Sequence, residues 1–189
     1  MVGNCSTLCT FVPEMHYYLK YLRHYLVSHS RHGTHSPFVY RLVDEVLYQR
    51  PSSIAVEAVP LVYKRGGKKA VKKFLFLERL LKAFAFEEFK IADKSMQHDL
   101  VQLFERHSHV SSKRTMHYIN TDADYSEILA DVAEHDILII EEPHLSENRE
   151  KHWEFLKRAQ NVVVTIDLFH LGLVFFRKGQ RKENFLIRF

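Results

Sequence analysis

Glycine is scarce in this chain: it accounts for only 6 of the 189 residues, and none lies between Lys68 and Leu171. Glycine-rich loops hold nucleotide cofactors because a backbone without Cβ atoms can take unusual angles and approach the ligand closely. The scarcity therefore excludes a conventional glycine-rich cofactor loop from the whole central part of the chain.

Cysteines and long apolar runs are also few. The two cysteines, Cys5 and Cys9, do not make a disulfide framework, which favours a reducing cytoplasm. No apolar run reaches the ~18 residues that a membrane helix needs. Residues 1–13 contain no basic region leading into an apolar stretch, so we expect no signal peptide. The formal net charge of +4 does not by itself indicate nucleic-acid binding. We expect a cytoplasmic protein that does not associate with a membrane.

Two parts of the chain differ in their apolar periodicity. Up to about residue 50 the apolar residues recur at helical spacing, and Ser36 can cap a helix that has Pro37 at its first position. With the ambiguous stretch that follows, this predicts an N-terminal helical extension over residues 1–67. From residue 68 onward the predicted helices alternate with predicted strands. These strands cover residues 88–92, 116–120, 136–140, 161–169, 171–176 and 185–189.

Such alternation predicts a parallel sheet with right-handed crossovers and helices on both faces. The C-terminal strands are joined by connections too short for a crossover, so we expect them to pair antiparallel. The predicted fold is a three-layer α/β core over residues 68–189, with a mostly parallel sheet and antiparallel C-terminal strands. The core and the helical extension are expected to form one compact unit. An edge strand at 185–189 could pair between two copies, which favours a homodimer.

Three segments carry a family resemblance. The chain reads HGTHSPFVY over residues 32–40, IIEEPHLS over 139–146, and VTIDLFHLGLVFFRK over 164–178 before NFLIRF at its end. In this order they resemble a family of small bacterial (Bacteroidetes-type) class I S-adenosylmethionine (SAM)-dependent methyltransferases. The resemblance implies a seven-stranded α/β sheet with a C-terminal hairpin.

The cofactor half of the chain departs from that family. Its members hold SAM with a Glu-x-Gly-x-x-x-Gly loop after the first strand, whereas the corresponding strand end here continues as Asp93, Lys94 and Ser95 without glycine. Asn120 stands near the place of the acidic residue that receives the ribose hydroxyls. These four residues are therefore the degenerate cofactor-binding positions. Lys94 and Ser95 could instead bind an anion at a helix start, or form a plain strand-to-helix turn. The shortened stretch before Glu141 indicates that at least one strand-helix unit is missing.

Glu141, Glu142 and His144 directly follow the most apolar predicted strand. Ligands bind at the carboxyl ends of strands in open α/β sheets. Two carboxylates and an imidazole there could bind a hard divalent ion or act as acid and base, and the resembling family has two Asp at this place. We predict these three residues as the candidate catalytic group. The alternative is a loop that serves helix capping and solubility.

Metal binding is not predicted. His29, His32 and His35 are spaced three residues apart and could suit zinc, but a glycine and a proline interrupt any helix that would align them. We interpret them as turn residues. Cys5 and Cys9 lack a complete set of partner ligands.

Two further features are charged. Residues 64–73 contain six Lys and Arg, which could hold phosphate or nucleic acid through a salt-sensitive interaction, or form a solvated loop leading into a helix. Asp167 lies within an apolar predicted strand, and the sequence indicates no task for it.

The resemblance and the missing glycine loop together favour a SAM-dependent methyltransferase-fold protein that is degenerate and non-catalytic, and that serves as a binding or scaffold module. No cofactor is then expected. One alternative is an active methyltransferase that uses SAM in an atypical pocket, with Glu142 or His144 as the base. A second alternative is a nucleic-acid binder that uses the basic run. The substrate of any such activity is not indicated by the sequence.

Overall fold

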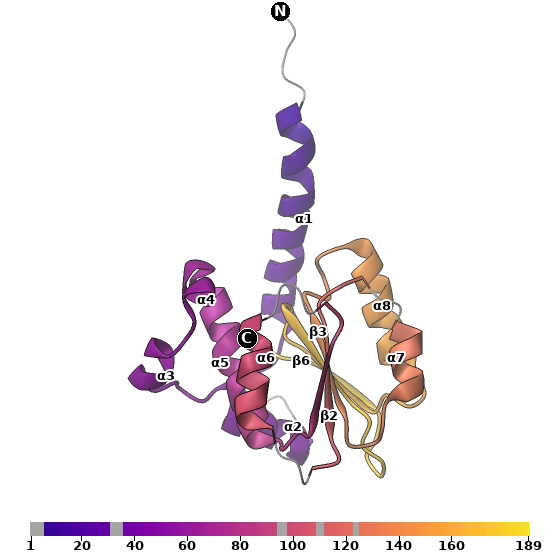
Figure 1. Cartoon of the computed structure of the whole chain (residues 1–189). Helices are drawn as coiled ribbons and strands as arrows, with labels where there is room; N and C mark the ends of the chain where they lie inside the picture. The colour runs from indigo at the N-terminus through magenta and orange to yellow at the C-terminus, as the bar shows by residue number, and fades with distance from the viewer. Residues whose placement is uncertain (1–5, 31–35, 94–97, 109–111, 123–124) are drawn as a thin grey trace, which may run out of the picture.

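The computed structural model describes residues 6–30, 36–93, 98–108, 112–122 and 125–189, with side chains from residue 15 onward (Figure 1). The predictions made for Lys94, Ser95, His32, His35 and Cys5, and for the side chain of Cys9, lie outside the described residues.

Helices dominate the first half of the chain. They are α1 (Ser6–Val27), α2 (Pro37–Leu42), the π-helix η2 (Val43–Leu47), α3 (Ser53–Glu57), α4 (Leu61–Arg65) and α5 (Gly67–Ala83). Ser36 is the N-cap of α2, where its side chain accepts from the backbone N–H of Val39, and Pro37 is the first helical residue, as predicted.

The basic run lies in helices, so the expectation of a solvated loop at residues 64–73 is wrong. Lysines are good helix formers, and the run continues α4 into α5 with one break. Gly67, with φ 80, supplies that break because its positive φ turns the backbone between the two helices. The basic side chains therefore project from helical surfaces at fixed angles to one another.

A six-stranded mixed sheet forms the centre of the described structure, in the order β1-β2-β3-β5-β4-β6. Its strands are β1 (Glu88–Ile91), β2 (Thr115–Ile119), β3 (Ile137–Glu141), β4 (Val164–Asp167), β5 (Leu171–Phe175) and β6 (Glu183–Leu186). The first three strands are parallel, and β5 lies antiparallel between β3 and β4. The α/β class and the antiparallel C-terminal hairpin agree with the prediction. The resemblance implies seven strands, whereas the described sheet has six.

The expected antiparallel pairing of the last strand is wrong. Both sides of β5 are occupied, by β3 and β4, so β6 passes to the far side of β4 and pairs with it in parallel. The outer edge of β6 is also partly covered. The His29 backbone N–H donates to the Leu186 carbonyl at 2.8 Å, and the Arg188 N–H donates to the His29 carbonyl at 3.1 Å. An edge-to-edge dimer through residues 185–189 is thereby disfavoured.

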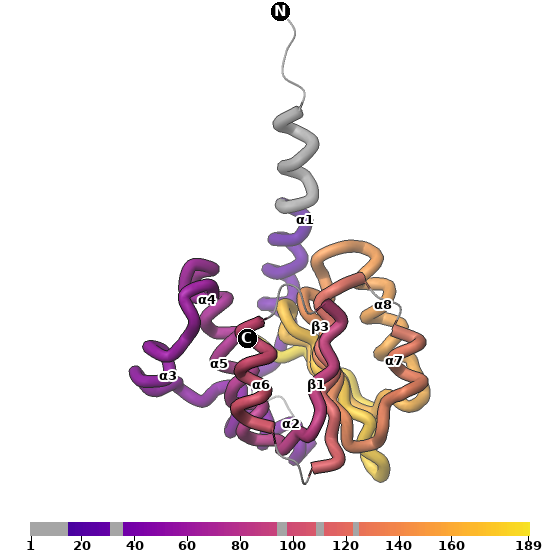
Figure 2. The backbone as a smooth tube through the Cα atoms, in the orientation of Figure 1, coloured from indigo at the N-terminus to yellow at the C-terminus, as the bar shows by residue number. Residues whose placement is uncertain are grey.

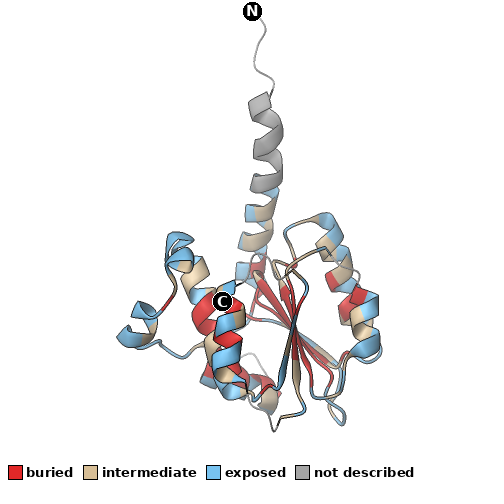
Figure 3. Cartoon of the chain, in the orientation of Figure 1, coloured by how far each residue is buried: buried red, intermediate tan, exposed pale blue. Residues whose placement is uncertain are grey.

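Helices cover both faces of the sheet. The remaining helices are α6 (His98–His107), α7 (Tyr125–Asp131) and α8 (Glu147–Arg158). Helices α2, α5 and α6 lie on one face, and α7 and α8 lie on the other (Figure 1). Each face has its own apolar core, and the two are separated by the sheet, whose inner strands β2, β3, β4 and β5 are almost entirely buried (Figure 3). Because the core of the first face includes residues from α2, η2 and α5, these helices are packed onto the α/β core.

Helix α1 projects from the end of the sheet at which β3 and β4 terminate, and the chain ends beside α5 (Figures 1 and 2). Among the described helices, none is both long enough and apolar enough to cross a membrane.

Candidate functional site at the carboxyl edge of the sheet

The candidate site is built by two neighbouring loops. Strands β3 and β4 run in the same direction on either side of β5, so their carboxyl ends meet at one edge. The backbone N–H of Glu142 donates to the His170 carbonyl at 3.0 Å and joins the two loops. Glu142 (φ 50) and Phe169 (φ 68) are the two described non-glycine residues with positive φ. Such strained backbone persists only where its surroundings hold it in place.

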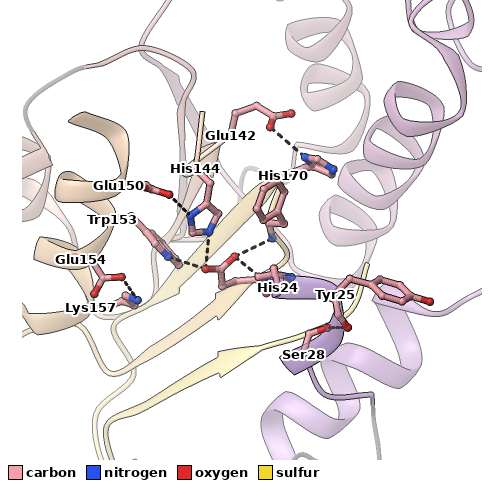
Figure 4. Close-up of polar contacts among 12 residues, drawn as sticks. His24, Tyr25, Ser28, Glu142, His144, Glu150, Trp153, Glu154, Lys157 and His170 are labelled. Carbon is pink, nitrogen blue, oxygen red and sulfur yellow. Dashed lines mark hydrogen bonds and ion pairs between the residues drawn. The ribbon is translucent and has the colours of Figure 1, made fainter. Parts of the chain in front are cut away.

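Asp167, at the end of β4, is the hub of the buried part of the site. Its partners His24, His144 and Trp153 lie around one another in Figure 4. Only 5% of Asp167 is exposed. It accepts from His144 Nε2 at 2.8 Å and Trp153 Nε1 at 3.0 Å, and from the Phe169 backbone N–H at 2.8 Å. The His24 imidazole of α1 lies 3.2 Å away. Burial opposes ionisation, but the interactions with His144 and His24 outweigh it and lower the pKa of Asp167.

His144 lies between two carboxylates. Its Nε2 contacts Asp167, and its Nδ1 lies 3.3 Å from Glu150 of α8, which is in turn 2.7 Å from Lys20 Nζ of α1. The imidazole ring stacks on Phe169, with 4.9 Å between the ring centres. Burial opposes the charged form of His144, but the hydrogen bonds with Asp167 and Glu150 prevail and raise its pKa. His144 is therefore held as part of a chain of alternating charges.

Glu142 is the centre of a second group, nearer the surface. The Tyr17 hydroxyl donates to it at 2.6 Å, Lys69 Nζ lies at 2.8 Å, and His170 Nδ1 lies at 3.2 Å. Although burial acts in the opposite direction, these three partners lower the pKa of Glu142 to about 2. Burial and then the bond to Glu142 raise the pKa of Tyr17. Burial lowers the pKa of His170, whose ring stacks on Tyr21 of α1.

Glu141 faces α5. Its carboxylate forms an ion pair with Lys73, and both side chains are about 85% shielded from solvent. Its backbone carbonyl accepts from Arg149 of α8 at 2.9 Å. Burial and the negative charge of Glu141 raise the pKa of Tyr118, a buried residue of β2.

The three predicted catalytic residues thus reach the same edge of the sheet, but each is paired with a different protein group. Glu141 is paired with Lys73, Glu142 with Lys69, and His144 with two carboxylates. The arrangement can neutralise charge and fix the two loops.

The predicted cofactor positions that the structure describes pair with each other. The Asp93 backbone N–H donates to Asn120 Oδ1 at 3.0 Å, and Asn120 Nδ2 donates back to the Asp93 carbonyl at 3.2 Å. The Asn120 side chain therefore ties the carboxyl ends of β1 and β2 together, in the place where the resemblance implies a ribose contact.

Within the residues that the structure describes, no group of three or more His, Cys, Asp or Glu is arranged to hold a metal ion. Of the histidines spaced three apart, His29 pairs through its backbone with the end of β6.

Sequence reasoning did not identify several residues of this site. The sequence did indicate that Asp167 is paired in the fold, because a carboxylate inside an apolar strand needs hydrogen-bond or ionic partners when it is buried. The sequence indicated the contribution of α1 less clearly. Its residues Tyr17, Tyr21 and His24 recur at helical spacing and share the face that contacts the loops. Lys69 and Lys73 belonged to a run that was considered only as a basic patch.

Comparison of the chain with known protein families, with curated protein sequences and with solved structures finds no match.

Proposed function

We propose that this chain is a methyltransferase-fold protein that does not transfer methyl groups and that serves as a binding or scaffold module in the cytoplasm. The observation that carries the proposal is the occupation of the carboxyl edge of the sheet by the protein's own groups. Helix α1 places Tyr17, Lys20 and His24 there, and α5 adds Lys69 and Lys73.

A catalytic role would require these residues to give up their partners. A general base works best when its pKa lies near the operating pH, whereas the pKa of Glu142 is about 2. His144 is held between Asp167 and Glu150, and removing either carboxylate would leave buried charge without compensation. The residues at the carboxyl edge of the sheet are therefore better suited to holding the structure together than to transferring protons. This favours a non-catalytic protein over an active methyltransferase.

Helix α1 supplies a surface for the scaffold role. Its inner face contacts the two loops, and its opposite face is apolar and uncovered in the described structure (Figure 3). The outer face comprises Met15, Tyr18, Leu19, Leu22 and Leu26, each between 53% and 69% exposed. These five residues are spaced as in the contact face, or seam, of two paired helices. Exposed apolar surface of this kind marks interaction sites.

The partner that fits this face best is a second copy of the chain. Between residues 15 and 27 the helix has no acidic residue, and the five side chains of the seam are uncharged, so the seam matches an apolar surface better than a charged one. An antiparallel pair about a two-fold axis between Leu19 and Leu22 would place Met15 opposite Leu26 of the other copy. It would also place Tyr18 opposite Arg23, a cation–π contact.

The absence of methyl-transfer machinery is tested by thermal unfolding of the purified full chain with and without millimolar SAM or S-adenosylhomocysteine. We expect neither ligand to change the midpoint. Ligand at 100 times its dissociation constant would stabilise the protein by about 2.7 kcal/mol and raise the midpoint by a few degrees. Such a shift would overturn the non-catalytic assignment.

Self-association is tested by light scattering coupled to size-exclusion chromatography. We expect the wild type to be a dimer and the double variant Leu19→Asp/Leu22→Asp to be a monomer. Leu61→Asp, which changes an exposed leucine of α4 away from this face, is the control and should remain a dimer. A wild type that is monomeric at 100 µM, or a dimeric double variant, would exclude the α1 pairing.

A further inference from the structure

A second region of the molecule combines a hollow with unpaired positive charge. A cavity of about 600 Å³ opens between the end of η2, helices α3 and α4, and one face of α5. Its apolar lining includes Leu47, Pro51, Val56, Val71 and Leu75. This size is typical of small-molecule sites, and the lining can bury a hydrocarbon or aromatic body.

Every charged residue that lines the cavity is a cation. The five are Arg50, Lys64, Lys68, Lys72 and Arg79. In the part of the chain that the structure describes, none of them lies within 4.0 Å of a carboxylate. The contacts that they do make are with backbone carbonyls and an aromatic ring: Arg79 Nε donates to the Val46 carbonyl at 2.7 Å, and Lys72 Nζ lies 4.1 Å from the centre of the Phe189 ring.

Lys72 is close enough to Arg79 to be affected by its positive charge. Partial desolvation and then the charge of Arg79 lower the pKa of Lys72, and desolvation lowers the pKa of Arg79. An anion between these two side chains would relieve the repulsion and would be held by charge-assisted hydrogen bonds.

The geometry of α5 explains why the basic run does not act as one patch. Lys69 and Lys73, four residues apart, face the carboxyl edge of the sheet and pair with Glu142 and Glu141. Lys68 and Lys72 are offset by one residue and line the cavity. A nucleic-acid site needs a continuous basic track along the phosphate backbone. Division of the run between two faces disfavours it, whereas the hollow with its apolar floor favours a small ligand.

We propose that this cavity binds an amphipathic organic anion, whose apolar body enters the hollow and whose carboxylate or phosphate is held by Lys68, Lys72 and Arg79. The proposal is independent of the scaffold function, because none of these residues contributes to the carboxyl edge of the sheet.

The test uses isothermal titration of the full-length protein with dodecanoate and dodecyl phosphate below their micelle concentrations. Dodecanol and dodecyltrimethylammonium, which have the same chain and no negative charge, are the comparison ligands, together with inorganic phosphate and a 20-nucleotide single strand. We expect the two anionic amphiphiles to bind at one site per chain and the neutral, cationic and purely inorganic probes not to bind. The binding of the single strand in their place would overturn the proposal.

Two variants locate the site. Lys68→Gln/Lys72→Gln removes two cations and should weaken binding about ten-fold or more, because hydrogen bonds to charged groups are lost. Lys82→Gln, on the same helix but outside the cavity, should bind like the wild type. Val56→Trp, at an exposed position of the lining, should block entry without disturbing the core. Anionic amphiphiles that bind equally to the double variant, or to Val56→Trp, would exclude the cavity, and a wild type that binds neither would refute the proposal outright.

Discussion

Helix α5 presents lysines to two regions that differ in what faces them. At the carboxyl edge of the sheet, Lys69 and Lys73 meet carboxylates, and the space is filled by aromatic and histidine side chains of α1 and the loops. At the cavity, Lys68 and Lys72 meet no carboxylate among the described residues, and the space is open. Buried charge of one sign stabilises a fold where opposite charge is built in, whereas cations that face an open cavity leave room for an anionic ligand. The first region is therefore expected to matter for stability and the second for binding.

The largest effect on stability is expected at Asp167. Asp167→Ala removes the acceptor of Trp153 and of the Phe169 backbone N–H, and it leaves His144 and His24 without their shared carboxylate. We expect the free energy of unfolding, measured with urea, to fall by about 3–5 kcal/mol, as when one partner of a buried ion pair is removed. A loss below about 1 kcal/mol would show that the carboxyl edge is not held together by this residue.

A smaller effect on the free energy of unfolding, which depends on pH, is expected at Glu142. Its pKa is lowered on folding from 4.5 to about 2, so its contribution is complete above pH 4.5 and is lost as the pH falls toward 2. The wild type should exceed Glu142→Gln in unfolding free energy, and this difference should shrink by about 3 kcal/mol over that range. Both proteins contain Asp167, so its titration cancels in the difference. If the unfolding free energies of the two proteins changed in parallel with pH, the lowered pKa of Glu142 would be contradicted.

The sharpest comparison uses adjacent lysines of α5. Lys73→Gln leaves the shielded Glu141 carboxylate without its cation and should cost about 1–3 kcal/mol of unfolding free energy. Lys72→Gln removes a cation that has no carboxylate partner among the described residues and only a contact with the Phe189 ring, so it should change stability by less than about 1 kcal/mol. Equal losses in urea unfolding would mean that the two faces of α5 do not differ in the way described.

The local features of the fold could be predicted from the sequence. Strands, helices and caps follow from periodicity and from side-chain bonds within a few residues, so the cap at Ser36 and the α/β class were accessible. The position of β6 could not be predicted from the sequence. It depends on β5 entering between β3 and β4, which is a choice among long-range pairings that no local pattern encodes.

The candidate site divides in the same way. The sequence by itself determined that no glycine-rich loop is present and that Glu141, Glu142 and His144 follow a buried strand. Only the tertiary structure decided what those residues contact, because the partners Tyr17, Lys73 and Asp167 come from α1, α5 and β4, between 23 and 125 residues away along the chain. It also decided which lysines of the basic run neutralise acids and which face the cavity. A rotation of about 100° per residue around α5 separates neighbours in the sequence onto different faces, and only the packing of the helix determines what each face meets.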